Sequence, residues 1–302
     1  MNRREFIQSM VVTVAGVVAT STFGTPARTF IPELDSRKKE KMKFQQIRSA
    51  TAIVTFVGIR FLIDPWLAPK DACPPIPGSA NPTLRCPIHE LPLAIPEILK
   101  VDAVIATHLH FDHFDETAMK SIPKTMPILA QDEIDADSLR QNGFADVRVL
   151  KYGGIDFNGV TLIKTDCIHG QPGEIGRLYE KLPIRKEACG VVIKSAAEAK
   201  TLYLAGDTVW CEYVDAAIRD HRPDVIVVNA ARAAVAPFGP IIMGLEDIEK
   251  VLAAAPKATV IASHMDNVGH ATVWRRDIRE FIARNGTAGR LIVPEDGETC
   301  CI

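Results

Sequence analysis

Three of the eight histidines in this 302-residue chain lie in one short run that also holds an aspartate. The polar members of the run are His108, His110, Asp112 and His113. His108 and His110 are two residues apart at the end of a β-like segment, so both side chains leave the same face. Imidazoles and a carboxylate at this density are typical of metal ligands. A purely structural role, in which each side chain forms its own hydrogen bonds, would be the better explanation for a single histidine. The run therefore predicts a metal site, and Asp112 and His113 follow closely enough to reach a second centre.

Three further candidate ligands each follow an apolar segment that reads as a strand. His169 follows residues 160–165, Asp207 follows residues 201–204, and His264 follows residues 260–262. Side chains at strand ends converge on one rim of a layered sheet structure, where such folds build their sites. We expect these residues to meet the first cluster there.

The elements that must position these residues are short β-rich segments alternating with helical ones. Strands are expected at 52–57, 60–63, 102–107, 127–129, 147–151, 160–165, 190–194, 201–204, 225–228, 260–262 and 291–293. Helices are expected at 133–142, 214–221, 245–255 and 271–285, and a long proline-rich loop at 66–92. Strands and helices mixed over about 250 residues predict a layered α/β domain.

The first 43 residues differ from the rest in composition. A charged start with Arg3 and Arg4, an apolar segment over residues 10–19, and small residues up to Ala27 resemble a twin-arginine signal peptide. This pattern predicts a signal at 1–27, a polar linker at 28–43 and one globular domain at 44–302. It also predicts the export machinery as a partner and a periplasmic or exported location. The open alternatives are an uncleaved membrane anchor and a chance pair of arginines.

Composition excludes some functions. The formal net charge is −2, and no basic segment interleaves with aromatic residues, so nucleic acid is not an expected partner. The chain has seven cysteines, of which Cys73 and Cys86 flank a loop rich in proline and glycine. These two are the best candidates for a disulfide, and free thiols remain the alternative because connectivity cannot be read from sequence.

The order of these motifs resembles the metallo-β-lactamase superfamily over about residues 45–300. The segment Ile63-Asp64-Pro65-Trp66-Leu67 and the ending around His264 and His270 resemble a narrower group that includes the ascorbate-6-phosphate lactonases. The resemblance implies a four-layer αββα sandwich with two divalent ions. It is also compatible with a homo-oligomer.

The resemblance further implies a division of the ligands. His108, His110 and His169 would hold the first ion, Asp112, His113 and His264 would hold the second, and Asp207 would bridge them. Zinc suits this imidazole-rich set, and manganese is compatible with it because carboxylates contribute.

The expected chemistry is hydrolysis by a hydroxide that two metal ions share. The residual positive charge of such a site favours a small anionic ester, lactone or phosphate ester. Asp112 is expected to accept a proton and His270 to act as an acid or substrate contact. Arg232 and Trp66 are weaker substrate candidates, and Asp64 is expected to orient a ligand histidine. The alternatives are a phosphodiesterase of the same fold and a metal-binding or sensor protein without turnover.

Overall fold

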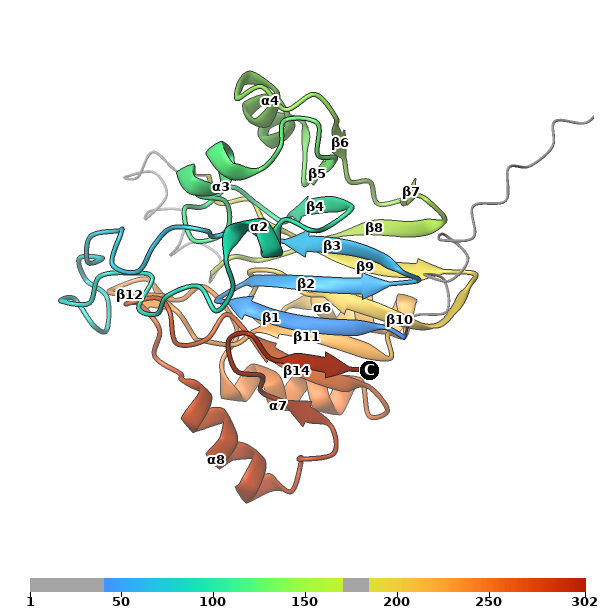
Figure 1. Ribbon diagram of the computed structural model, residues 1–302. Helices are drawn as coiled ribbons and strands as arrows, with labels where there is room; N and C mark the ends of the chain where they lie inside the picture. Colours follow the sequence, from blue (N-terminus) through green and yellow to red (C-terminus); the bar gives the residue numbers. More distant parts are fainter. Residues whose placement is uncertain (1–40, 171–184) are drawn as a thin grey trace, which may run out of the picture. The chain divides into compact units, whose positions relative to one another are not determined.

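The structure is a computed structural model, and it describes residues 41–170 and 185–302. The chain divides into residues 1–32 and residues 33–302, and only the second unit contains described residues. The predicted export signal, and the linker as far as residue 40, lie outside the described residues. Within the described part, two mixed seven-stranded sheets are flanked by helices (Figure 1), as the α/β sandwich prediction requires.

The first sheet joins an antiparallel half to a parallel half. Its order is β16-β1-β2-β3-β4-β5-β6; β16, β1, β2 and β3 pair antiparallel, while β3 to β6 pair parallel. The strands are β1 (Lys43–Arg48), β2 (Thr51–Phe56), β3 (Ile59–Ile63), β4 (Ala103–Ala106), β5 (Ile128–Ala130), β6 (Val147–Val149) and β16 (Thr299–Cys301).

The second sheet has the same plan, in the order β15-β14-β11-β10-β9-β8-β7. Strands β7 to β10 pair antiparallel, and β10, β11, β14 and β15 pair parallel. The strands are β7 (Ile155–Phe157), β8 (Val160–Asp166), β9 (Cys189–Ser195), β10 (Glu198–Leu204), β11 (Val225–Asn229), β14 (Thr259–Ser263) and β15 (Leu291–Ile292); β12 (Ala234–Val235) and β13 (Gly239–Pro240) form a separate ribbon.

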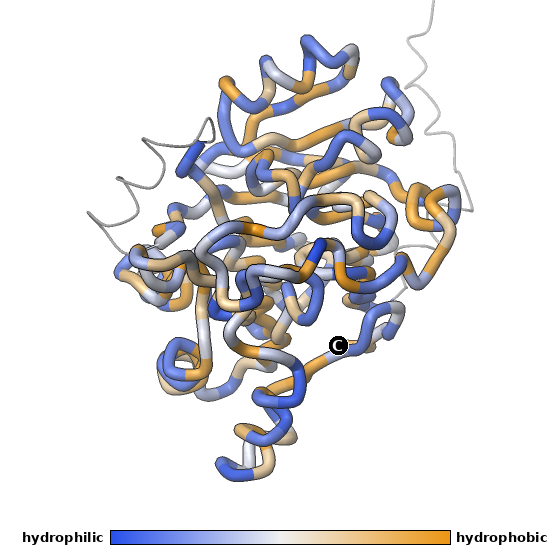
Figure 2. The backbone as a smooth tube through the Cα atoms, turned by 90° about the vertical axis from the view of Figure 1, so that its left-hand side faces the viewer, coloured by the Kyte–Doolittle hydropathy of each residue, from blue (hydrophilic) through white to orange (hydrophobic). Residues whose placement is uncertain are grey.

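The four layers enclose three apolar cores. Successive residues of a strand point to opposite faces of its sheet, so each sheet contributes to two of these cores. In β3, Phe61 and Ile63 pack between the sheets, while Leu62 faces the helices outside. In β11, Val227 likewise packs between the sheets and Ile226 faces outward. Strands buried on both faces read as continuous apolar segments. The coloured tube in Figure 2 shows such hydrophobic segments alternating with hydrophilic ones along the backbone.

The helices cover the outer faces of the sheets. The core outside the first sheet takes residues from α2 (Ile95–Ile98), α3 (Glu116–Ser121) and α4 (Glu133–Gln141). The core outside the second sheet takes residues from α6 (Glu212–His221), α7 (Leu245–Ala254) and α8 (Arg275–Asn285). Asp115 and Asp132 cap α3 and α4 by accepting backbone N–H bonds. Among the described residues, no helix is long and apolar enough to cross a membrane.

The observed elements differ from the expected ones at several boundaries. Helix α8 begins at Arg275 and not at Ala271, because the N–H groups of Thr272 and Val273 donate to the Ala231 carbonyl instead. Strand β1 begins at Lys43, inside the expected linker. The elements that were not expected from the sequence are β1, β7, β12, β13, β16, α2 and α3.

The strands that precede the candidate ligands end on the same side of their sheet. In the first sheet β3 and β4 are parallel, and in the second sheet β8, β10, β11 and β14 run in one direction. The residues just beyond these ends therefore emerge on the same rim of each sheet.

Candidate metal centre

The structure brings together seven side chains from the two sheets. The run 108–113 follows β4, while His169, Asp207 and His264 follow β8, β10 and β14. Their potential ligand atoms form three groups, each with all atoms within 4.8 Å of one another. The groups are His108, His110 and His169; His108, His113 and Asp207; and Asp112, His113 and His264.

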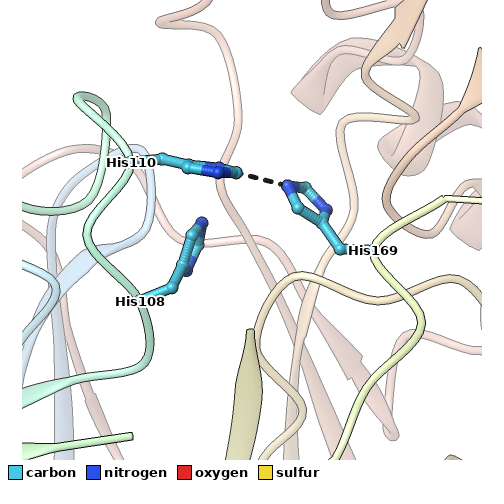
Figure 3. A group of neighbouring side chains, drawn as sticks. All are labelled: His108, His110 and His169. Carbon is cyan, nitrogen blue, oxygen red and sulfur yellow. Dashed lines mark hydrogen bonds between the residues drawn. The ribbon is translucent and has the colours of Figure 1, made fainter. Parts of the chain in front are cut away.

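The three imidazole rings of the first group converge on one point. Figure 3 shows the rings of His108 and His110, from one loop, pointing toward His169 on a facing segment. His169 Nε2 lies 3.3 Å from His110 Nδ1, and the ring centroids of His108 and His110 are 4.4 Å apart. This geometry matches the three residues expected to hold one ion.

The second group lies beside the first. His113 Nε2 is 3.2 Å from His264 Nε2, and His264 Nε2 is 3.6 Å from an Asp112 carboxylate oxygen. These are the three residues expected to hold the other ion.

Asp207 lies between the two groups. Its Oδ2 is 3.2 Å from His113 Nε2, 3.6 Å from His169 Nε2 and 3.9 Å from His108 Nε2. Its Oδ1 accepts a hydrogen bond from the Asn229 side-chain amide at 2.6 Å. One carboxylate oxygen within reach of imidazoles from both groups is the arrangement that a bridging ligand requires.

Each of the five candidate ligand histidines has one ring nitrogen on the outer side of the cluster, and this nitrogen contacts another group of the protein. His169 Nδ1 lies 2.9 Å from the Ile241 carbonyl, His110 Nε2 lies 2.5 Å from the Arg185 carbonyl, and His113 Nδ1 lies 2.9 Å from an Asp64 oxygen. The remaining two nitrogens contact hydroxyls, His264 Nδ1 that of Ser49 at 3.2 Å and His108 Nδ1 that of Thr107 at 3.1 Å. Such contacts fix the orientation of ligand histidines.

His108 Nε2 provides the fit test for a metal. This nitrogen is buried and has no hydrogen-bond partner among residues 41–170 and 185–302. A buried polar atom without a partner is costly unless something binds it. Together with the convergent imidazole and carboxylate atoms around it, this atom makes the donor set suitable for a divalent ion.

The pKa shifts of His169, His108 and Asp207 favour the protonation states that metal binding needs, whereas Asp207 and Asp64 outweigh burial and raise the pKa of His113. Burial lowers the pKa of His169 to about 4, and burial with the neighbouring His113 and His110 lowers the pKa of His108. Burial alone would raise the pKa of Asp207, but the nearby His113 and His264 hold it well below its usual range. Neutral imidazoles and an ionised carboxylate are the forms that bind metal ions.

Asp64 lies where it can orient a ligand, as expected. Its Oδ2 contacts His113 Nδ1, and its two oxygens accept hydrogen bonds from the Thr107 N–H and hydroxyl, each at 2.7 Å. Asp64 and His264 both have positive φ, of 43° and 64°. Left-handed backbone at non-glycine residues is often found at functional sites.

A cavity of about 610 Å³ adjoins the cluster. His110, Asp112, His169, Asp207 and His270 line one side of it. The remaining wall is mainly apolar and includes Ile76, Leu109, Phe111, Phe114 and Ile241. Thus any substrate would meet the candidate ligands and an apolar surface together.

The three weaker candidates fall in different places. His270 lines the cavity, and the Asn81 side chain holds its neighbours by donating to the carbonyls of Gly269 and Ala271. Trp66 is fully buried and, contrary to expectation, is not among the described residues that line the cavity; its ring packs edge-to-face on Phe111, with centroids 6.1 Å apart. Arg232 is exposed and does not line the cavity; its aliphatic chain packs beside Gly244.

Several residues at the candidate site carried no signal that the sequence reasoning used. Phe111 is inside the histidine run but was not considered as a substrate contact. Asn229 ends a strand on the same rim as the ligands, and that rule could have identified it. Ser49 and the carbonyls of Ile241 and Arg185 have no sequence signature, because only the fold places them beside a histidine.

Comparison with known proteins places this chain among metal-dependent hydrolases. Residues 59–265 match the family model of the beta-lactamase superfamily domain. The chain is 41% identical to the UPF0173 protein YddR of Bacillus subtilis over 259 residues, which are 85% of this chain and 99% of that protein.

Two solved structures are similar throughout the domain. One is an isothiocyanate hydrolase from Delia radicum gut bacteria, with 42% identity and a TM-score of 0.81, covering 86% of this chain and 99% of that one. The other is described as a possible metal-dependent hydrolase from Veillonella parvula, with 40% identity and a TM-score of 0.82, covering 87% of this chain and all of that one.

Proposed function

The chain belongs to the beta-lactamase superfamily, and on this premise we propose that it is a dinuclear hydrolase of small, uncharged electrophiles with an apolar substituent, such as isothiocyanates. The observation that carries the proposal is the apolar wall of the cavity beside the ligand cluster. The 42% identity to an isothiocyanate hydrolase supports the same substrate class.

The charge of the cavity wall favours a neutral substrate over the anionic one expected from the sequence. The acidic side chains that line it are Asp112, Asp115, Glu116 and Asp207, and no lysine or arginine is among the lining residues that the structure describes. An anionic substituent would therefore lack a cationic partner other than the metal ions. An apolar substituent would gain about 25 cal/mol per Å² that it buries.

When bound, the two ions supply an activated water and positive charge beside the developing negative charge. For an isothiocyanate, the water oxygen bonds to the central carbon, and the bond between that carbon and the nitrogen breaks. Both water hydrogens end on the nitrogen, so the products are an amine and carbonyl sulfide. Asp112 lines the cavity and is placed to accept a proton from the water. His270 lines the same cavity and is placed to donate a proton to the departing nitrogen.

A lactone or ester is the second candidate substrate. The segment around Asp64 and Trp66 and the ending around His264 and His270 resemble the ascorbate-6-phosphate lactonases, and a lactone also presents a carbonyl carbon to the same nucleophile. Zinc remains our proposed metal and manganese the alternative.

The experiment is a metal-dependent assay of the purified protein against three substrates: benzyl isothiocyanate, a γ-lactone and a phosphodiester. We expect amine release from the isothiocyanate that is lost on chelation and in His110→Ala. The matched control is His221→Ala, a histidine at the end of α6 that does not line the cavity.

The three outcomes separate the candidate functions. Turnover of the lactone or the phosphodiester without the isothiocyanate would replace the proposed substrate. Metal-loaded protein that turns over none of the three would favour a binding or sensor role.

A further inference from the structure

The long loop after β3 closes on itself where Cys73 meets Cys86. The two residues form an isolated antiparallel bridge, in which Cys73 N–H donates to the Cys86 carbonyl at 2.7 Å and Cys86 N–H to the Cys73 carbonyl at 3.3 Å. Paired residues of this kind have Cα atoms about 5.5 Å apart, inside the range that a disulfide spans.

The other five cysteines lack this arrangement. Cys300 and Cys301 are successive residues of β16, so their side chains point to opposite faces of the sheet. Cys189 is buried within β9, Cys211 precedes α6, and the Cys167 thiol contacts the Ala205 carbonyl at 3.2 Å. Among the cysteine pairs, only Cys73 and Cys86 are joined by an antiparallel bridge in the described residues.

The pair Cys73 and Cys86 lies next to the cavity of the candidate metal centre. Cys73 is half-buried and lines the cavity beside the ligand cluster, whereas Cys86 is fully buried. The loop between them also supplies Ile76 to the cavity wall and Asn81, which holds the backbone on both sides of His270. A cross-link at its base would fix this wall without moving the backbone.

We infer that Cys73 and Cys86 are a disulfide-forming pair that locks the wall of the cavity. A small disulfide such as oxidised glutathione is the oxidant: Cys73 sulfur displaces one glutathione, Cys86 sulfur then displaces the other, and the two thiol protons leave on the two glutathiones. Exchange begins at Cys73, because Cys86 is not accessible. The inference does not depend on the proposed substrate.

Peptide mapping tests the pair directly, because the chain has a tryptic cleavage site between the two cysteines. Trypsin cuts after Lys70, Arg85 and Lys100, so the two thiols fall in adjacent peptides, 71–85 and 86–100. Metal-loaded protein equilibrated with oxidised glutathione should yield these two peptides covalently joined, and dithiothreitol should separate them. Free peptides, or a glutathione adduct on Cys73 without the joined species, would overturn the inference.

Thermal unfolding provides an independent readout. Closing a loop of this length should raise the Tm of the oxidised protein by roughly 5–10 °C over the reduced protein. Cys73→Ser should abolish that difference, and the control Cys301→Ser should retain it. If Cys73→Ser retained the full difference, another pair would be responsible and the inference would be wrong.

Discussion

At the residue scale, the metal centre depends on side chains that lie just outside the ligands. Asp64 is the clearest case, because one carboxylate holds the Thr107 backbone and contacts the outer nitrogen of His113. The Asn229 amide likewise holds one oxygen of Asp207, which leaves the other oxygen directed at the histidines. The grouping of the candidate ligands was predictable from their residue types and spacing. Most of their supports were not, because a backbone carbonyl such as that of Ile241 gives no sequence signal.

Replacing Asp64 tests this support. Asp64→Asn should weaken metal binding about 10- to 100-fold, because the His113 ring loses the carboxylate that orients it. Competition with a chromogenic chelator measures the affinity. The matched control is Asp156→Asn, an exposed carboxylate within β7 that accepts a hydrogen bond from the Gly159 N–H. Equal affinities in Asp64→Asn and the wild type would show that the contact does not contribute.

Phe111 tests the apolar subsite. Its ring is 43% exposed, lines the cavity and packs edge-to-face on Trp66. Phe111→Ala should raise KM for an isothiocyanate with a large apolar substituent on the order of tenfold, because the substituent loses a surface to bury against. KM for methyl isothiocyanate should change little.

Steady-state kinetics on the two isothiocyanates check this prediction. Tyr213→Ala, at an exposed aromatic residue of α6, is the control. A parallel loss on both substrates would indicate a general disturbance of the site and not a substituent subsite.

At the element scale, strand ends and one long loop position the site. The apolar segments that become β4, β8, β10, β11 and β14 were predicted from sequence, because strands buried on both faces need continuous apolar residues. Strands β7 and β16 were missed because each has only three residues, and β16 also pairs with β1 at the other end of the domain sequence. The 66–92 loop was predicted as a loop, but its attachment to the domain through Arg48 was not.

Arg48 is the main attachment of that loop. Its guanidinium is fully buried and donates to the carbonyls of Trp66, Ala68 and His89 at 2.7, 2.8 and 3.1 Å. Arg48→Met should destabilise the protein by about 3 kcal/mol, because it leaves buried carbonyls unsatisfied. Urea unfolding measures this change.

Arg85→Met is the matched control for Arg48. Arg85 is an exposed arginine of the same loop that also donates to loop carbonyls, and its replacement should change stability by less than about 0.5 kcal/mol. Equal unfolding free energies for the two variants would mean that Arg48 does not anchor the loop.

At the scale of the whole molecule, the ligand set joins the two halves of the sandwich. Each predicted ion takes two ligands from the loop after β4 of the first sheet. From the second sheet it takes one ligand of its own, His169 or His264, and shares Asp207. Metal binding should therefore hold the two sheets together, a role that we call the clamp, in addition to its role in catalysis. No single element contains enough ligands for either ion.

Metal removal tests the clamp. A ligand present at about 100 times its Kd stabilises a protein by about 2.7 kcal/mol, so chelation should lower Tm by roughly 5–10 °C. Scanning calorimetry with and without a chelator measures the shift. In His110→Ala the shift should be smaller, because the first ion has lost a ligand, and a full-sized shift in that variant would contradict the assignment.

The metal content of the protein is the most direct test of a dinuclear hydrolase. Elemental analysis of the purified wild type should give about two equivalents of transition metal per chain, falling sharply in His110→Ala and in Asp207→Ala. His221→Ala should keep the wild-type content. Wild-type protein that takes up less than about one equivalent when offered zinc or manganese, with no change in the ligand variants, would contradict the dinuclear centre and the mechanism built on it.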